Sequence, residues 1–130
     1  MLSRMEEKRP RTCLIADDSR VVRKLARLLL ENLDFECSEV DDGQQAFDAC
    51  LKSLPDVVLL DWNMPVMDGI EFTRKLRALP GGAAPKIIFC TVFNDTPHIE
   101  EALAAGADEY IMKPFDNDIV ISKFQQAGAL

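Results

Sequence analysis

The sequence predicts an α/β fold built on one doubly wound, five-stranded parallel sheet with helices on both faces. Apolar runs of strand length alternate five times with stretches that carry apolar residues at helical spacing. Residues 57–60 are continuously apolar and β-branched at their start, which is typical of a strand buried on both faces. Strict alternation of strands and helices at these lengths indicates parallel strands joined by helical crossovers.

The first half of the chain supplies three strands and two helices of this pattern. The predicted strands are residues 12–16, 35–40 and 57–60. A helix over residues 20–33 begins after Ser19, whose hydroxyl can accept a backbone N–H of the first turn. The second helix ends before Pro55. The apolar faces of these helices are Val22, Leu25, Leu29 and Leu33, and Ala46, Phe47, Cys50, Leu51 and Leu54.

The second half supplies two strands and three helices. The predicted strands are residues 86–90 and 110–112, and the predicted helices are residues 70–79, 96–105 and 116–126. The segment 80–85, rich in Pro and Gly, is a loop. Gly106 is expected to cap the helix that precedes it, because glycine adopts the left-handed conformation without steric penalty.

Size and composition favour a single domain. The chain has 130 residues, of which 48% are hydrophobic and 28% charged, as in ordinary globular domains. We expect a flexible N-terminal tail at residues 1–11 and one folded domain at residues 12–130. We expect no output domain after Phe124.

Charge and hydropathy exclude several classes of function. The formal net charge of −7 disfavours a nucleic-acid surface, which needs clustered Lys and Arg. No apolar stretch reaches the roughly 20 residues of a membrane span, and no signal peptide is apparent, so we expect a cytoplasmic protein. The four cysteines form no C-x-x-C pair and are interpreted as small hydrophobic residues in a reducing compartment.

Polar side chains follow four of the predicted strands where each strand ends. Asp17 and Asp18 follow the first strand, Asp61 the third, Thr91 the fourth and Lys113 the fifth. One such residue is usually a turn former or a helix cap. In an open parallel sheet, however, the carboxyl ends of the strands meet at one edge, where ligands bind. We therefore expect these side chains to form one site.

The residue types of this site suit phosphoryl transfer. Carboxylate oxygens are the ligands that Mg²⁺ prefers, and Mg²⁺ also accepts a phosphate oxygen. A carboxylate can attack phosphorus, and the remaining requirement is positioning and charge neutralisation, which Lys113 and Thr91 can supply. The site is therefore predicted to be a Mg²⁺-dependent phosphoacceptor.

The order of Asp17-Asp18, Asp61, Thr91 and Lys113-Pro114 resembles the receiver domain of two-component response regulators. The stretch 61–69 (DWNMPVMDG) is especially similar to the stand-alone chemotaxis regulators. The resemblance covers residues 12–124 and implies a flavodoxin-like fold with strand order 2-1-3-4-5.

The resemblance also implies a role for each site residue. Asp61 would be the phosphorylated residue, and Mg²⁺ would be held by the carboxylates of Asp17, Asp18 and Asp61 and the backbone carbonyl of Asn63. Thr91 and Lys113 would contact the phosphoryl oxygens. Tyr110 would move inward as Thr91 is drawn to the phosphate, from a partly solvated position in the unphosphorylated form. The Lys113–Pro114 peptide bond would be cis.

As a member of this family, the protein would be a single-domain response regulator and not an enzyme with an external substrate. A sensor histidine kinase or a histidine phosphotransfer protein would phosphorylate it, and it would slowly dephosphorylate itself. It would be a monomer that binds a downstream protein through the face formed by residues 96–105, 110–112 and 116–126. Val92 stands directly after the threonine, where the family usually has a very small residue, and would narrow access to the phosphoryl group. Phe93, at the next position, is also bulky and apolar where the family varies.

Two other functions stay open from the sequence. One is a receiver-like interaction module that works without phosphorylation, and the other is a phosphate sink that drains a competing regulator. Four further residues are given modest roles. His98 is interpreted as solvent-exposed, Met64 and Met67 as packing residues, and Trp62 as a possible fluorescent reporter of the site.

Overall fold

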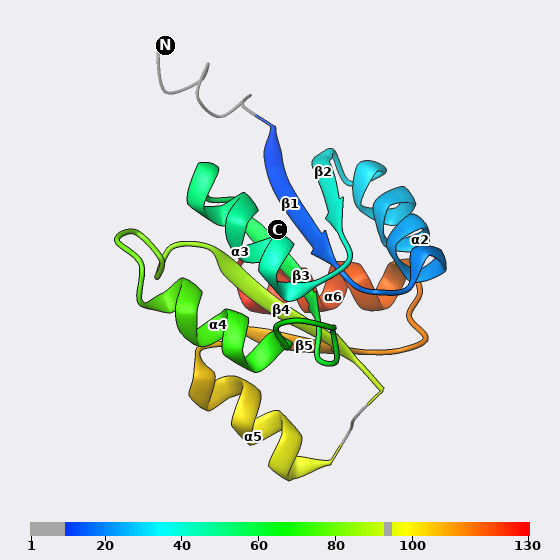
Figure 1. Ribbon diagram of the computed structural model, residues 1–130. Helices are drawn as coiled ribbons and strands as arrows, with labels where there is room; N and C mark the ends of the chain where they lie inside the picture. Colours follow the sequence, from blue (N-terminus) through cyan, green and yellow to red (C-terminus); the bar gives the residue numbers. More distant parts are fainter. Residues whose placement is uncertain (1–9, 93–94) are drawn as a thin grey trace.

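The apolar runs of the sequence form the strands of one parallel sheet (Figure 1). The computed structural model describes residues 10–92 and 95–130. The strands are β1 (Arg11–Ala16), β2 (Phe35–Val40), β3 (Val57–Asp61), β4 (Lys86–Thr91) and β5 (Glu109–Met112). All four strand pairings are parallel and the order is β2-β1-β3-β4-β5, so the predicted fold class and strand order are confirmed.

Helices cover both faces of this sheet (Figure 1). On one face lie α2 (Arg20–Glu31) and α6 (Asn117–Ala127). On the other lie α3 (Gly43–Lys52), α4 (Gly69–Arg77) and α5 (Thr96–Ala105). Every residue of β3 is buried, because β3 is central and its alternate side chains enter the two apolar layers.

Side-chain caps fix where the helices begin. Ser19 caps α2 as predicted, accepting a hydrogen bond from Val22 N at 3.3 Å. An aspartate performs the same function at the N-terminus of each other described helix. These caps are Asp42, Asp68, Asp95 and Asp116. Gly106 ends α5 with a φ of 119°, also as predicted.

The predicted apolar face of the first helix packs on the sheet through Val22, Leu29 and Leu33, but Leu25 does not take part. Leu25 is 41% exposed, whereas Ala26 and Leu30 are fully buried in the apolar layer. The small side chain of Ala26 lets the helix approach the sheet closely, so the buried stripe is centred on this residue. The guanidinium groups of Arg23 and Arg27 both donate to Glu39 in β2.

Three cysteines are buried and the fourth, Cys37, is half-buried. Burial raises the pKa of the thiols above its usual range, to about 11 in Cys50 and about 12 in Cys90. The thiols are therefore protonated at neutral pH and pack as small hydrophobic side chains.

The predicted tail, residues 1–11, lies mostly outside the described residues. Of its last two residues, Arg11 already belongs to β1, one residue earlier than expected. Its guanidinium donates to the Ala129 carbonyl at 2.9 Å, which ties the start of the sheet to the C-terminal end of the chain.

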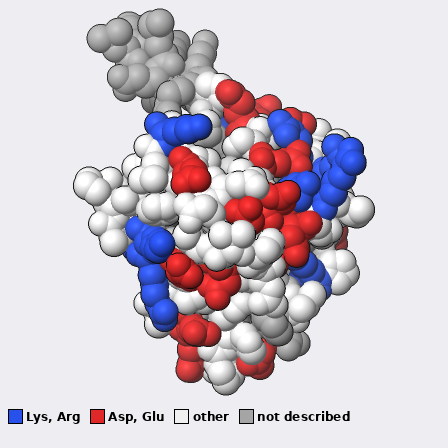
Figure 2. All heavy atoms as spheres, viewed as in Figure 1, with Lys and Arg blue, Asp and Glu red and all other residues white. Residues whose placement is uncertain are grey.

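Acidic side chains gather near the middle of the face drawn in Figure 2, with Lys and Arg in smaller groups around them. This distribution agrees with the net charge of −7. Within the described ranges, none of the helices is both long and apolar enough to cross a bilayer.

Candidate functional site

Asp61 is the last residue of β3, and only 8% of its surface is exposed. The loop that follows folds back against it, because Gly69 N donates to the Trp62 carbonyl at 2.9 Å. A Cβ atom on Gly69 would lie 2.6 Å from the Asp61 carbonyl oxygen, so glycine is needed at this close approach. The loop therefore packs directly against the backbone of Asp61.

The loop after β1 places two more carboxylates beside Asp61. Ala16 pairs with Leu60 across β1 and β3, so the next residues along, Asp17 and Asp61, are neighbours at the sheet edge. Asp17 is buried, and its Oδ1 accepts a hydrogen bond from Ser19 N at 2.8 Å. Asp18 is exposed. The structure brings one oxygen from each of the three carboxylates within 4.8 Å of the others.

Lys113 follows β5 and reaches into this acidic cluster. Its Nζ lies 2.8 Å from Asp17 Oδ2 and 3.3 Å from Asp61 Oδ1. Lys113 N donates to the Thr91 carbonyl at 2.8 Å, which extends the contact between β4 and β5. The Lys113–Pro114 peptide bond is cis. One ammonium group therefore partly neutralises two carboxylates.

The crowding of like charges perturbs the ionisation of Asp61. Burial and, after it, the neighbouring Asp17 carboxylate raise the pKa of Asp61 to about 6, despite the opposing charge of Lys113. Burial alone would lower the pKa of Lys113, but its contacts with Asp17 and Asp61 outweigh this, and the pKa lies above its usual value. The site therefore holds more negative charge than Lys113 can balance.

The acidic cluster fits a divalent cation. Asp17 Oδ2 is buried and, although it is ion-paired with Lys113, it accepts no hydrogen bond of good geometry from the described residues. A buried acceptor left in this way is unfavourable, and a cation ligated there would satisfy it. Mg²⁺ binds through one or two carboxylates and keeps several waters, which suits a cluster with one exposed member, Asp18.

The remaining predicted site residues belong to β4, to β5 and to the loop after β3. Thr91 is the last residue of β4 and is buried. Asn63 is exposed in the loop after β3. Tyr110, paired with Phe89 in the sheet, is half-buried against the layer of α3, α4 and α5. The Lys123 Nζ of α6 lies over the Tyr110 ring, 4.4 Å from its centroid.

The modest roles given to nearby residues are compatible with the structure. Met64 and Met67 are buried in the core. The His98 side chain is 36% exposed and has neighbours of its own. Its ring packs on Trp62 with 5.1 Å between centroids, and its Nδ1 lies 2.7 Å from Asp95 Oδ2. Val92 is 66% exposed, whereas Phe93 lies outside the described residues.

Comparison with known proteins identifies the family to which the chain belongs. The family model described as the response regulator receiver domain matches residues 13–125. The chain belongs to this family. Receiver domains are signalling modules of two-component systems, and this one is CheY-like.

Curated relatives differ in how much of their length this receiver domain covers. It is 38% identical over 109 residues to the chemotaxis protein CheY of Halobacterium salinarum, covering 83% of this chain and 88% of that protein. It is 33% identical over 115 residues to the phosphate regulon transcriptional regulatory protein PhoB of Pseudomonas aeruginosa. That match covers 88% of this chain but 50% of PhoB, so the receiver domain spans about half of such a relative.

Solved structures of receiver domains superimpose on the whole fold. The chemotaxis response regulator CheY4 of Vibrio cholerae matches with a TM-score of 0.86 and 28% identity over 91% of this chain and 98% of that one. The receiver domain of the sensor histidine kinase PA1611 of Pseudomonas aeruginosa matches with a TM-score of 0.81 and 28% identity, covering 92% of this chain and 98% of that one. The PA1611 domain has a magnesium ion coordinated in its active-site cleft.

Sequence reasoning missed the polar network beneath the acidic loop. Arg23 contacts the Asp17 carbonyl and Glu39, although it is not on the predicted apolar face of its helix. A signal was present in the sequence. Cys37 and Glu39 alternate along β2 on the side that faces α2, and Arg23 and Arg27 are one helical turn apart.

Proposed function

We propose that this receiver domain accepts a phosphoryl group on Asp61 from a phosphohistidine donor. The observation that supports this most directly is the cluster of Asp17, Asp18 and Asp61 with Lys113 between two of its members. The cluster is held on the ends of rigid strands, so its members need little rearrangement to act together.

The chain's own residues account for the transfer. An Asp61 carboxylate oxygen forms the new bond to phosphorus, the bond from phosphorus to the donor imidazole breaks, and that imidazole takes up a proton. The Lys113 ammonium, already 3.3 Å from Asp61 Oδ1, neutralises charge on the phosphoryl oxygens. The hydroxyl of Thr91 donates to another phosphoryl oxygen.

Mg²⁺ would be held by Asp17, Asp18 and Asp61 together with the carbonyl of Asn63. When bound, it supplies positive charge that offsets the repulsion between the carboxylates and the incoming phosphoryl group. Slow hydrolysis returns the protein to its starting state, and the side chain of Val92 restricts the approach of water.

The proposed donor is a sensor histidine kinase or a histidine phosphotransfer protein. The protein would act as a monomer in the cytoplasm. Its phosphorylated form would bind a downstream protein through the face of α5, β5 and α6, where Tyr110 lies half-buried beneath Lys123. Thr91→Ala should still be phosphorylated at Asp61 but should lose most phosphorylation-dependent partner binding. If phosphorylated Thr91→Ala bound the downstream protein as well as the phosphorylated wild type, the proposed coupling of Thr91 to the movement of Tyr110 would be contradicted.

A phosphorylation assay tests the proposal. The protein is incubated with phosphoramidate, whose P–N bond resembles that of phosphohistidine, in Mg²⁺ or in EDTA, and intact mass is measured. We expect a base-labile phosphoryl adduct in Mg²⁺ only. Asp61→Asn should carry none, because an amide cannot attack phosphorus in this way. An adduct at wild-type level in Asp61→Asn would sink the assignment.

Further measurements distinguish the two alternative functions, a module that works without phosphorylation and a phosphate sink. A module that works without phosphorylation would show neither adduct nor a Trp62 fluorescence response to Mg²⁺ and a phosphate analogue. A phosphate sink would be phosphorylated, but a pull-down would recover the same proteins with the phosphorylated and unphosphorylated forms.

A further inference from the structure

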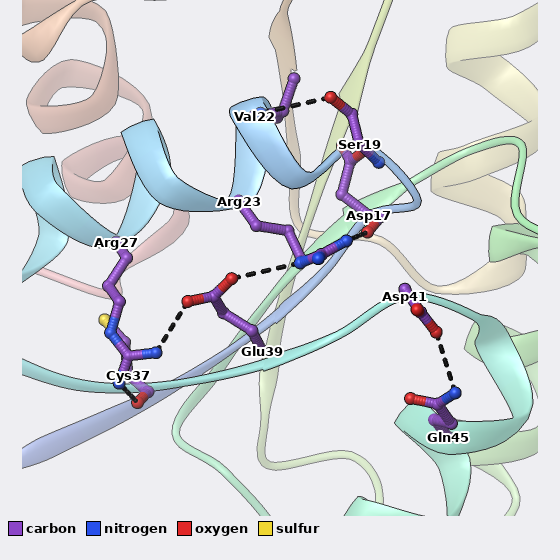
Figure 3. Close-up of polar contacts among 9 residues, drawn as sticks. All are labelled: Asp17, Ser19, Val22, Arg23, Arg27, Cys37, Glu39, Asp41 and Gln45. Atoms are coloured by element: carbon purple, nitrogen blue, oxygen red, sulfur yellow. Dashed lines mark hydrogen bonds and ion pairs between the residues drawn. The ribbon is translucent and has the colours of Figure 1, made fainter.

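Arg23 links the acidic loop to strand β2. It lies in the first turn of α2, and its side chain turns back toward the end of β1 (Figure 3). Its Nη1 donates to the Asp17 carbonyl oxygen at 2.7 Å, and its Nε lies 3.1 Å from Glu39 Oε1. Only 16% of the Arg23 side chain is exposed. A planar guanidinium with both contacts made is held in one orientation.

The carbonyl that Arg23 holds belongs to the peptide group joining Asp17 to Asp18. The Asp17 side chain has a restraint of its own, because its Oδ1 accepts from Ser19 N. The Asp18 carboxylate is exposed and accepts no hydrogen bond from the described residues. Its position relative to Asp17 and Asp61 therefore depends on the backbone, and Arg23 fixes that backbone.

Glu39 keeps this contact from adding free positive charge beside the site. It accepts from Arg23 with one oxygen and from Arg27 Nη1, at 2.8 Å, with the other. Arg27, and to a lesser degree Arg23, hold the pKa of Glu39 below its usual range, so Glu39 is ionised at neutral pH. Glu39 thus offsets part of the Arg23 charge, and the contribution of Arg23 to the site is chiefly one of position.

We propose that Arg23 is a positioning residue for the divalent cation. By holding the Asp17 carbonyl it presents the Asp17 and Asp18 carboxylates in the arrangement that binds the ion. The inference rests on the proposed function, which places Mg²⁺ at this cluster. Arg27 provides a natural comparison, because it shares Glu39 and donates to the Cys37 carbonyl but has no bond to Asp17 (Figure 3).

Mg²⁺ titration of the metal-free protein tests this role. Trp62, the single tryptophan of the chain, follows Asp61 directly and serves as the fluorescent probe. Arg23→Met keeps the aliphatic stem but removes every donor, and we expect its Mg²⁺ Kd to rise about 10-fold, as for other groups that orient metal ligands. Arg23→Lys should recover part of the affinity, since an ammonium can still reach one acceptor. Arg27→Met should bind Mg²⁺ like the wild type.

The outcomes separate positioning from general stabilisation. Equal Kd values for Arg23→Met and the wild type, or equal weakening in Arg23→Met and Arg27→Met, would overturn the inference while leaving Mg²⁺ binding intact. A wild type that does not respond to Mg²⁺ in fluorescence or in melting temperature would overturn the proposed function and this inference with it.

A second variant covers the case in which Arg23→Met does not fold. Glu39→Gln leaves the guanidinium in place but removes the charge that orients it, and we expect its Kd to rise about 3-fold. An unchanged Kd in Glu39→Gln would then count against the positioning role.

Discussion

Under the proposed function, Asp61 combines two demands that conflict in a metal-free protein. A phosphoacceptor must be shielded and surrounded by carboxylates that bind a cation, and both conditions disfavour its ionised form. The pKa of about 6 expresses that conflict, with burial as its first cause and Asp17 as its second. The contacts of Lys113 relieve only part of it.

The sign of the resulting pH dependence follows from linkage. The folded state holds the Asp61 proton up to a pH of about 6, whereas the unfolded chain releases it near its ordinary pKa of about 3.9. Between these values the folded state binds more protons, so ionisation of Asp61 lowers the stability of the metal-free wild type as pH rises from about 4 to 6.

Asp61→Asn should remove this dependence. In EDTA, we expect its free energy of unfolding to match that of the wild type at pH 4 and to exceed it above pH 6 by about 1–2 kcal/mol, a value reduced for solvent screening. Urea unfolding of both proteins across this pH range measures the difference. A difference that stays constant with pH would show that Asp61 is not the titrating group.

Val66 occupies an unfavourable backbone conformation. Its φ is 71°, where a β-branched side chain is strained, and it is the middle residue of a tight turn closed by Met67 N and the Pro65 carbonyl at 2.8 Å. The Val66 side chain is 78% exposed, so little packing opposes its replacement.

Val66→Asn should therefore stabilise the protein by about 1 kcal/mol, because asparagine tolerates positive φ. Val21→Asn is the matched control, since Val21 is 79% exposed but lies in regular helix α2. We expect its stability to change by no more than about 0.5 kcal/mol. Melting temperatures of the two variants give the comparison, and equal shifts would argue against strain at Val66.

At the scale of elements, Arg77 fastens α4 to two connecting segments at the other end of the sheet. Its guanidinium donates to the carbonyls of Gly82 and Pro85 in the loop before β4, and to the Gly106 carbonyl and the Asp108 carboxylate before β5. Asp108 also accepts from Ile87 N at 2.8 Å. The Arg77 side chain is 18% exposed, so these bonds are largely shielded from water.

Arg77→Ala should lower the free energy of unfolding by about 2–4 kcal/mol, because several buried carbonyls lose their donor together. The same change at Arg74, an exposed position on the same helix, should alter it by less than about 0.5 kcal/mol. Chemical denaturation of the two variants tests this. Similar losses of unfolding free energy in both would mean that helix propensity, and not the hydrogen bonds of Arg77, is responsible.

For the molecule as a whole, we expect the acidic cluster to couple cation binding to stability. The fold holds three carboxylates in mutual repulsion, and a ligand that binds only the folded state relieves it. At a free Mg²⁺ concentration of 100 times its Kd, the wild type should gain about 2.7 kcal/mol.

Asp18→Asn should reverse the order of stability between the two conditions. Without metal it should melt above the wild type, since one repelling charge is gone, and in Mg²⁺ it should gain less than the wild type. Calorimetry in EDTA and in Mg²⁺ gives both values. An Asp18→Asn protein that melts below the wild type in EDTA would show that repulsion at Asp18 is not a significant strain on the fold.

The sequence by itself determined the fold class, the strand positions and the convergence of polar residues at one sheet edge. Those properties depend on the period and length of apolar runs, and the carboxyl ends of parallel strands must meet whatever packs around them. The capping roles of Ser19 and Gly106 were also predictable, because a cap depends only on the residues of its own helix.

Only the tertiary structure decided how the helices are rotated and what supports the site. Leu25 is exposed and Arg23 is largely buried because α2 packs on the sheet through Ala26. This orientation results from packing between elements and not from the spacing of residues within one element. The same is true of the Lys113 contacts to Asp17 and Asp61 and of the raised pKa of Asp61. These are distances and burial between segments remote in sequence, and no local pattern carries them.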